Sequence, residues 1–309
     1  MTEAGFLAAL RALPLHPGAA GLGDDAARLG DWVLTTDTIV EGVHYVAGDA
    51  PEDVAWKLVA VNLSDLAAKG AAPEGALLNY PLSPAKGERW DRQFLAGLDS
   101  ALRGLACPLL GGDTVSLPAG APRVITLTAI GRALVSPVRS GARAGDALYV
   151  TGTIGDAGAG LKIARGERGP EELLAAYRRP HPRLAEGGAL APVVAAMMDV
   201  SDGLLVDAAR MAGASGLEVT IDLAAIPLSA AYRAFAGDDR AARLAAATAG
   251  DDYELLFAAP ADLALPVPAT LVGRFSAPES LSQEHVPLTL IDAGGAVALP
   301  ESLGFTHGD

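Results

Sequence analysis

Aspartate stands beside glycine, serine or threonine in six short segments that are spread over most of the chain. Carboxylates and small hydroxyls on tightly bending backbone are ligands of a hard cation. Mg2+ binds one or two carboxylates at a time, while water and phosphate oxygens complete its shell. A fold that uses all six segments must bring them together, and we predict phosphoryl transfer with several metal ions on a polyphosphate substrate. The segments are residues 23–27 (GDDAA), 35–38 (TTDT), 62–65 (NLSD), 111–114 (GGDT), 199–203 (DVSDG) and 250–253 (GDDY).

Length and charge restrict the classes of protein that this chain can belong to. A chain of 309 residues favours two domains, and since half of the residues are hydrophobic, a sizeable core is available. The net charge of −14 argues against a nucleic-acid surface. It does not exclude phosphate ligands, because bound cations reverse the local charge. The alternative is that the acidic surface only aids solubility.

The sequence carries no sign of a membrane segment. Glu3 is the only charged residue before Arg11, and this pattern argues against a signal peptide. No uncharged run approaches the ~18 residues of a membrane span. We expect a soluble, cytoplasmic protein that binds neither membrane nor nucleic acid.

Hydrophobic periodicity predicts alternating helices and strands in both halves of the chain, which indicates an α/β fold. In the first half we expect helices at 3–13, 51–70 and 87–106, and strands at 32–37, 75–80, 108–111 and 123–132. Residues 133–145 mix proline, glycine and basic residues, so we predict two domains, 1–137 and 138–309. In the second half we expect strands at 148–151, 217–222, 253–258, 269–275 and 286–292, helices at 170–178, 183–197 and 203–214, and a glycine-rich turn at 152–160.

Asp65 gives the strongest argument from a single residue. On a helix, Val54, Leu58, Val61 and Asp65 lie on one stripe. A carboxylate that extends an apolar stripe is partly desolvated, which is costly unless it is paired or bound to a metal. The alternative is a salt bridge to Lys69, four residues further along the same face. We favour the metal.

Two other segments of the first half have equally simple structural alternatives. A strand that ends at Asp37 places Thr35 and Thr36 beside it, but a strand followed by an Asx turn gives the same pattern. Gly112 and Asp113 follow an apolar strand. Glycine there would let the backbone approach a phosphate closely, or would only form a tight loop.

In the second half, Asp199 and Asp202 flank Ser201 before a predicted helix. One N-cap needs only one such side chain, so we favour metal or phosphate binding over capping. Residues 152–156 (GTIGD) form a loop-to-helix junction that could hold phosphate, but they match neither a Walker A motif nor the Rossmann glycine spacing. His44 lies just beyond the proposed metal site at Asp37, but a lone histidine is more often structural than a ligand.

Taken in order, these segments resemble the thiamine-monophosphate kinase family, which belongs to the aminoimidazole-ribonucleotide-synthetase-like superfamily. The similarity runs from about residue 20 to the end of the chain. Each motif is weak alone, but six in the right order are specific. The motifs are GLGDDAA (21–27), TTDTIVEGVHY (35–45), VNLSDLAAKGA (61–71), LLGGDT (109–114), DVSDGL (199–204) and AGDDYEL (249–255).

The resemblance implies transfer of the terminal phosphoryl of ATP to thiamine monophosphate, giving thiamine diphosphate and ADP. It also implies two α/β domains and a homodimer in which the N-terminal domains share a β-barrel. By position, the implied Mg2+ ligands are Asp25, Thr35, Thr36, Asp37, Asp65, Asp113, Asp199 and Asp202. The implied ATP contacts are Gly112, Asp113, Arg139 and Ser201, and the implied thiamine contacts are His44, Asp251 and Phe305. Asp251 stands where the family often has glutamate.

We expect direct in-line transfer without a general base, because the attacking phosphate oxygen is largely ionised at neutral pH. Positioning and charge neutralisation would then supply the catalysis. Two alternatives are another ATP-using enzyme of the same superfamily, such as aminoimidazole ribonucleotide synthetase, and a non-catalytic nucleotide-binding protein.

Overall fold

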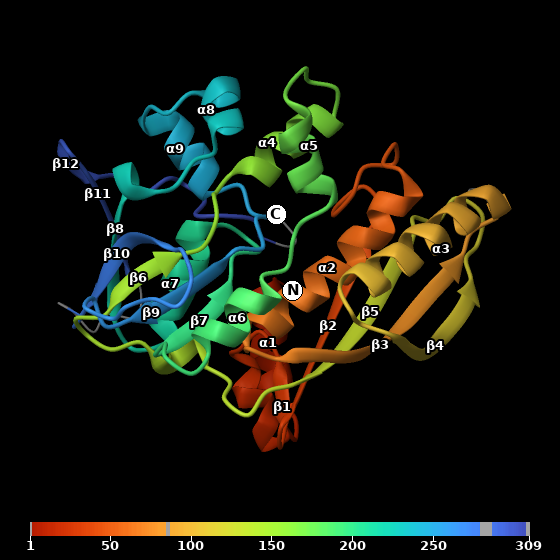
Figure 1. Cartoon of the computed structure of the whole chain (residues 1–309), viewed down its shortest axis with the longest axis horizontal. Helices are drawn as coiled ribbons and strands as arrows, with labels where there is room; N and C mark the ends of the chain where they lie inside the picture. The colour runs from red at the N-terminus through yellow and green to blue at the C-terminus, as the bar shows by residue number, and fades with distance from the viewer. Residues whose placement is uncertain (1, 85–86, 279–285, 307–309) are drawn as a thin grey trace.

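The chain forms two β-sheets with helices around them, as the computed structural model shows (Figure 1). The structure describes residues 2–84, 87–278 and 286–306. No helix within these ranges combines the length and the apolar character that a membrane span requires. The N-terminal segment, helix α1 (Glu3–Arg11) and the 3-10 helix η1 (Pro17–Leu22), precedes the first sheet.

The first sheet has five strands in the order β1-β2-β5-β3-β4. Its neighbours pair antiparallel except β3 and β4, which are parallel and are joined by the crossover helix α3 (Gly87–Gly104). The sheet buries alternate residues of β5 against the helices, as expected for a sheet that is covered on one face. The strands are β1 (Ala27–Leu29), β2 (Trp32–Val40), β3 (Ala72–Leu82), β4 (Leu109–Ser116) and β5 (Val124–Arg132).

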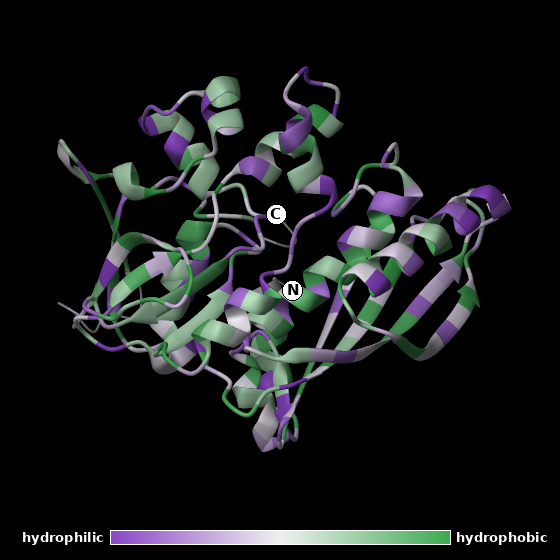
Figure 2. Cartoon of the chain, viewed as in Figure 1, coloured by the Kyte–Doolittle hydropathy of each residue, from purple (hydrophilic) through white to green (hydrophobic). Residues whose placement is uncertain are grey.

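The second sheet has seven strands in the order β12-β11-β8-β10-β6-β9-β7. All neighbours are antiparallel except β11 and β8. Strands β6, β7 and β9 are buried along their whole length and are coloured mainly as hydrophobic in Figure 2. The strands are β6 (Ala147–Val150), β7 (Ala196–Asp199), β8 (Glu218–Asp222), β9 (Leu255–Ala259), β10 (Thr270–Ser276), β11 (Leu288–Asp292) and β12 (Gly295–Val297).

Helices fill the remainder of the second half of the chain. The short 3-10 helix η2 (Arg139–Gly141) lies in the segment that joins β5 to β6, and η3 (Leu223–Ala225) follows β8. The α-helices are α4 (Asp156–Ala164), α5 (Glu171–Arg178), α6 (Leu184–Leu190), α7 (Leu204–Ala214), α8 (Ala230–Ala236) and α9 (Arg240–Ala247).

Helix α2 (Pro51–Ala68) lies between the two sheets and packs against both halves of the molecule. Proline at its first position and Glu52 and Asp53 in its first turn favour the helix start. Most of its residues are buried, including the predicted stripe Val54, Leu58 and Val61. An amphipathic helix buries one face, whereas α2 is enclosed on nearly every side because the second half of the chain covers the rest.

Three sequence predictions of local structure are wrong. Strand β4 continues past residue 111, so Gly112 and Asp113 lie within a strand and not in a loop. The predicted helix at 183–197 ends at Leu190, and its last residues belong to β7. A short apolar run does not distinguish a buried strand from a buried helix, and pairing with β9 decides for the strand. Helix α4 occupies much of the predicted turn at 152–160.

Helices α8 and α9 were not predicted at all. They have only seven and eight residues, and such short segments give too few turns for a helical repeat to be recognised in the sequence. The other predicted helices and strands are present, with ends that differ by a few residues.

The two halves meet closely where α6 lies against the end of α2. A Cβ atom on Gly187 would come within 2.1 Å of the carbonyl oxygen of Ala67. Gly70, two residues beyond the last residue of α2, has a φ of +60°, and a Cβ there would lie 2.3 Å from the Cβ of Ala191. This contact therefore depends on glycine at both positions.

We expect Gly187→Ala to destabilise the protein by about 1–3 kcal/mol, because the added methyl group meets backbone that cannot move without separating α2 from α6. Chemical denaturation measures the effect. The matched control is Gly188→Ala, one residue further on the same helix, where a Cβ meets nothing within 4 Å. Equal stability of the two variants would show that the contact between α6 and α2 has room for a methyl group.

Candidate active site

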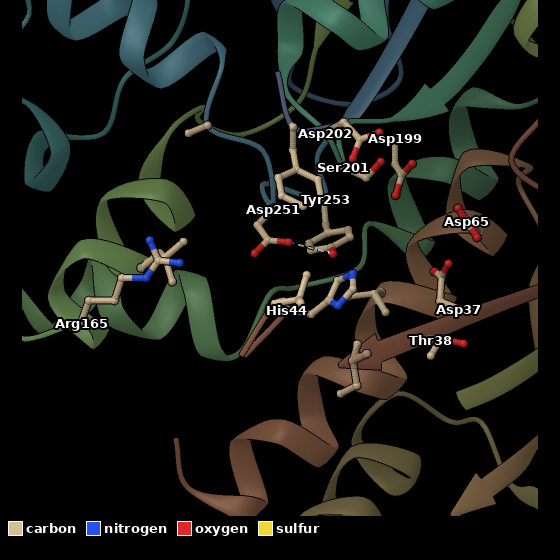
Figure 3. A pocket seen from close by; sticks show the side chains of 16 residues that line it. Asp37, Thr38, His44, Asp65, Arg165, Asp199, Ser201, Asp202, Asp251 and Tyr253 are labelled. Atoms are coloured by element: carbon tan, nitrogen blue, oxygen red, sulfur yellow. Dashed lines mark hydrogen bonds between the residues drawn. The ribbon is translucent and has the colours of Figure 1, made fainter. Parts of the chain in front are cut away.

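A cavity of about 460 Å³ lies where the two halves of the chain meet. One wall comes from β2, α2 and the segment after β2, and the other comes from α4 and the segments around β7 and β9. Figure 3 shows three carboxylates at one end and Arg165 at the opposite end. The lining residues are Asp37, Thr38, Ile39, Val43, His44, Val61, Asp65, Leu161, Arg165, Asp199, Ser201, Asp202, Ala249, Asp251, Tyr253 and Phe305.

Three carboxylates from distant parts of the sequence line the inner end of this cavity. Asp37 lies on β2, Asp65 on α2, and Asp199 at the end of β7. The buried hydroxyl of Thr35 donates a hydrogen bond to Asp65. Period-two alternation places Thr35 and Asp37 on the same side of β2, facing α2.

Helix α2 holds the neighbouring segments in place through buried polar side chains. The backbone N–H of Asp37 donates to Asn62 Oδ1 at 2.9 Å. Ser64 Oγ donates to Asp199 Oδ2 at 2.6 Å. Because Asn62 and Ser64 are fully buried, these bonds fix β2 and β7 relative to one helix.

The three carboxylates are difficult to ionise in the absence of a cation. Burial, with the charges of Asp25 and Asp202, raises the pKa of Asp37 to about 6. Burial and then the charges of Asp37 and Asp199 raise the pKa of Asp65 well above its ordinary value. The pKa of Asp199 is raised by burial and by Asp25. Among the described residues, no cationic side chain forms an ion pair with these three groups, and a divalent cation would supply the counter-charge.

The donor set fits Mg2+, which prefers carboxylate and hydroxyl oxygens. Within residues 2–84, 87–278 and 286–306, no three His, Cys, Asp or Glu side chains lie close enough together to hold one ion. An ion bound here would therefore use one or two carboxylates and take its other ligands from water and phosphate, as Mg2+ commonly does.

The carboxylates of Asp24 and Asp25 have a different environment. Lys69 Nζ lies 2.5 Å from Asp24 Oδ1 and 2.8 Å from Asp25 Oδ2. Arg139 also pairs with Asp25. Although burial acts to raise the pKa of Asp25, the charges of Lys69 and Arg139 lower it below its usual value. The alternative in which Lys69 pairs with Asp65 is therefore wrong.

The segment between β7 and α7 is shaped by one buried aspartate. Asp207 Oδ2 accepts the backbone N–H groups of Ser201, Asp202 and Gly203 at 3.1, 3.1 and 3.2 Å. Arg210 pairs with both Asp202 and Asp207. The N-cap residue of α7 is Gly203, so the interpretation of Ser201 or Asp202 as the cap is wrong.

His44, Asp251 and Phe305, which the resemblance assigns to the thiamine moiety, all line the cavity. His44 Nδ1 accepts the N–H of Val40 at 3.1 Å, so a neutral ring carries its hydrogen on Nε2. Asp251 accepts from Tyr253 Oη at 3.0 Å and from Lys57 Nζ at 2.7 Å. The N–H of Phe305 donates to Asp202 O at 2.9 Å, which holds the C-terminal segment against the site.

Thr36, Gly112 and Asp113 neither line the cavity nor contact the carboxylates described above. Thr36 is on the other face of β2, where its hydroxyl donates to Leu127 O at 3.2 Å. Asp113 of β4 pairs with Asn79 of β3, and Asn79 is connected through β5 to Thr38 of β2. Asp113 is therefore three strand spacings, or about 14 Å, away from Thr38.

Gly112 lies beside Asp113 on the exposed strand β4. A Cβ on Gly112 would lie 1.8 Å from Leu78 O. The glycine is thus required by its close approach to β3, and the prediction that it opens the backbone to a phosphate has no support within one chain.

The sequence arguments missed several residues at the site. Lys57 lies on α2 beside the stripe that carries Asp65, three residues after Val54 and four before Val61, and this position near an apolar stripe was a usable signal. Asp207 and Tyr253 stand within or just after motifs but look like ordinary helix and strand residues. Arg165 belongs to a polar helix end without any distinctive pattern.

Comparison with known proteins gives consistent matches over nearly the whole chain. Residues 23–133 match the family model for AIR synthase related protein, N-terminal domain, and residues 143–271 match AIR synthase related protein, C-terminal domain. Thiamine-monophosphate kinase of Salmonella typhimurium is 38% identical over 278 residues, which are 83% of this chain and 84% of that protein. The Caulobacter vibrioides enzyme of the same name is 37% identical over 94% of this chain and 86% of its own length.

Among solved structures, one described as AaThiL complexed with AMPPCP and TMP is similar with a TM-score of 0.84 and 29% identity. The match covers 99% of this chain and 97% of that chain.

We expect Asp37→Asn to stabilise the metal-free protein. Its folded-state pKa of about 6 lies above the ordinary value of 3.8, so ionisation costs stability between these pH values, and stability falls as pH rises through them. The variant avoids this cost. Its gain in urea denaturation with EDTA should be on the order of 1–3 kcal/mol above pH 6 and should disappear toward pH 4.

Asp262→Asn serves as the control, because this carboxylate is exposed and distant from the cavity lining. Its unfolding free energy should stay within about 0.5 kcal/mol of the unchanged protein. An Asp37→Asn variant that is no more stable than the unchanged protein at pH 7 would contradict the proposed burial of an unneutralised charge.

Proposed function

This chain belongs to the thiamine-monophosphate kinase family, and we propose that it transfers the terminal phosphoryl group of ATP to thiamine monophosphate, forming thiamine diphosphate and ADP. The observation that carries the proposal is a single cavity between the two halves of the chain. Asp37, Asp65 and Asp199 line one end of it and form no ion pair within the described ranges, and His44 and Asp251 line the same cavity further out. A kinase for two phosphorylated substrates needs such a combination of cation ligands and an organic-substrate corner.

Mg2+ is the proposed metal, bound as several ions that share Asp37, Asp65, Asp199 and Thr35, with one or two carboxylates on each ion. When bound, it would neutralise the charge on the triphosphate and on the incoming phosphate. The remaining ligands that the family resemblance implies are Asp25, Thr36, Asp113 and Asp202. Of these, Asp25 and Asp202 already pair with cationic side chains.

The chain's own residues would act mainly by positioning. The attacking oxygen belongs to a phosphate that is largely ionised at neutral pH, so no side chain needs to accept a proton. Ser201 and Arg139 are the proposed ATP contacts, and Asp207 holds Ser201 through the backbone. His44, Asp251 and Phe305 would fix the thiamine moiety so that its phosphate faces the carboxylates.

Two further features follow from the same proposal. We place the domain boundary between residues 137 and 138, in the segment that separates β5 from β6. We also propose a cytoplasmic location. We propose small phosphorylated molecules and not nucleic acids as the ligands, because a net charge of −14 disfavours a nucleic-acid surface.

We propose a homodimer in which the first sheets of two copies form a shared β-barrel. Strand β4 is an edge strand with every residue exposed, including Leu109, Leu110 and Val115. Long exposed edges with apolar residues are usually covered. The same strand carries Gly112 and Asp113, and we propose that these two residues serve the cavity of the partner copy.

The direct test is formation of thiamine diphosphate from ATP and thiamine monophosphate with Mg2+. Asp65→Asn should lower turnover at least about 100-fold, because it removes charge that acts on the transferred group. The control Asp99→Asn changes an exposed carboxylate on α3 and should keep full activity. ATP consumption without thiamine diphosphate would favour another enzyme of the superfamily, and nucleotide binding without turnover would favour a non-catalytic protein.

A mixed dimer tests the role of Asp113. If Asp113 serves the partner's cavity, Asp37→Asn and Asp113→Asn subunits together form one intact site, and an equal mixture should recover about a quarter of full activity. The control mixture of Asp37→Asn and Asp65→Asn should stay inactive, since both residues line the same cavity. Without recovery in the first mixture, the shared arrangement is wrong.

A further inference from the structure

The ammonium group of Lys69 is enclosed by four oxygen atoms from three parts of the chain. Lys69 Nζ lies 2.5 Å from Asp24 Oδ1, 2.8 Å from Asp25 Oδ2, 2.9 Å from Met197 O and 3.4 Å from Pro137 O. The side chain is only 2% exposed. Carboxylate and carbonyl oxygens are also the ligands that hard metal cations take from proteins.

Five aspartates at and beside the inner end of the cavity therefore form two groups with different counter-charges. Asp24 and Asp25 are neutralised by Lys69, with help from Arg139. Among the ion pairs of residues 2–84, 87–278 and 286–306, none involves the second group, Asp37, Asp65 and Asp199. One group is complete within the protein, and the other needs an added cation.

Lys69 also connects the parts that must be aligned for the site to exist. It follows the last residue of α2, whereas Met197 is on β7 and Pro137 is in the segment between the two sheets. Its bonds to their carbonyl groups hold the second half of the chain against α2. The same ammonium holds the segment of Asp24 and Asp25, which precedes β1.

We propose that Lys69 is a fixed cation of the active site, which occupies the place of a divalent ion between Asp24 and Asp25. This half of the carboxylate cluster is thus assembled before metal or nucleotide binds. Fewer exchangeable ions are then needed than the number of carboxylates suggests. The role of this fixed cation in catalysis rests on the proposed phosphotransfer function. The test of the proposal uses neither ATP nor thiamine monophosphate.

A divalent ion should replace the ammonium when the lysine is removed. In Lys69→Met, the carboxylates of Asp24 and Asp25 remain, 8% and 3% exposed, with Arg139 as their remaining cationic partner. Buried carboxylates without counter-charge destabilise the fold. A divalent ion bound between these carboxylates would restore stability. If Lys69 only formed an ordinary structural ion pair, its loss would not make the stability of the protein more dependent on divalent ions.

The experiment compares thermal unfolding of the metal-free protein with its unfolding in a Mg2+ or Mn2+ titration, without nucleotide. We expect Lys69→Met to have a lower Tm in EDTA and a divalent-ion shift several degrees larger than that of the unchanged protein. Mn2+ binding followed by electron paramagnetic resonance should show one additional bound ion. Lys69→Arg, which keeps the charge, should show no additional ion.

Two variants make the comparison specific. Lys57→Met removes the other buried lysine of α2, which pairs with Asp251 at 2.7 Å, and should lower the Tm without an enlarged metal response. In Asp24→Asn with Lys69→Met, the loss of one carboxylate should remove most of the additional response.

Equal divalent-ion shifts in Lys69→Met and the unchanged protein would overturn the proposal and leave Lys69 a structural residue. If Lys69→Met does not fold in EDTA, refolding with millimolar Mg2+ should recover it. Aggregation at every Mg2+ concentration, with Lys69→Arg folded, would also overturn the proposal. Failure of the kinase assay would leave these results unchanged, so the two proposals can fail separately.

Discussion

The burial of α2 between the two sheets is the constraint on which the rest of the structure depends. One side of the helix packs on the first sheet and on α3, and its end packs against α6 and β7. A helix in this position presents polar groups to both halves of the chain. Asn62 holds β2, Ser64 holds Asp199, and Lys69 holds the segment before β1. The cavity is therefore built around one rigid element, which suits a site that must position two charged substrates.

The cavity keeps a charge distribution that does not favour folding. Asp37, Asp65 and Asp199 have raised pKa values because they are buried near other aspartates, and within the part of the chain that the structure describes they form no ion pair. A protein selected only for stability would replace or pair them. These three carboxylates lie in a cavity, close to Asp24 and Asp25, which Lys69 neutralises. Such an arrangement is typical of a site whose counter-charge arrives with the ligands.

Much of this site could be predicted from the sequence. The stripe of α2 identified Asp65 as a desolvated carboxylate, and the serine, threonine and glycine residues beside the aspartates of 35–38, 199–203 and 250–253 marked segments that line the cavity. The local arguments failed where long-range pairing decides the outcome. Gly112 and Asp113 look like a phosphate loop, but parallel pairing of β4 with β3 makes them part of an edge strand. Residues 196–199 continue an apolar helix pattern, but pairing with β9 makes them a strand.

The sequence by itself determined the two-part α/β organisation and the types of residue available for the chemistry, because periodicity and motif order are local properties of the chain. Only the tertiary structure decided which carboxylates keep their charge unpaired. Lys69 is four residues from Asp65 and could have neutralised it, yet its ammonium reaches Asp24 and Asp25, more than forty positions earlier in the chain. Counter-charges are assigned by distance in space and by burial, and neither quantity can be read from spacing along the sequence.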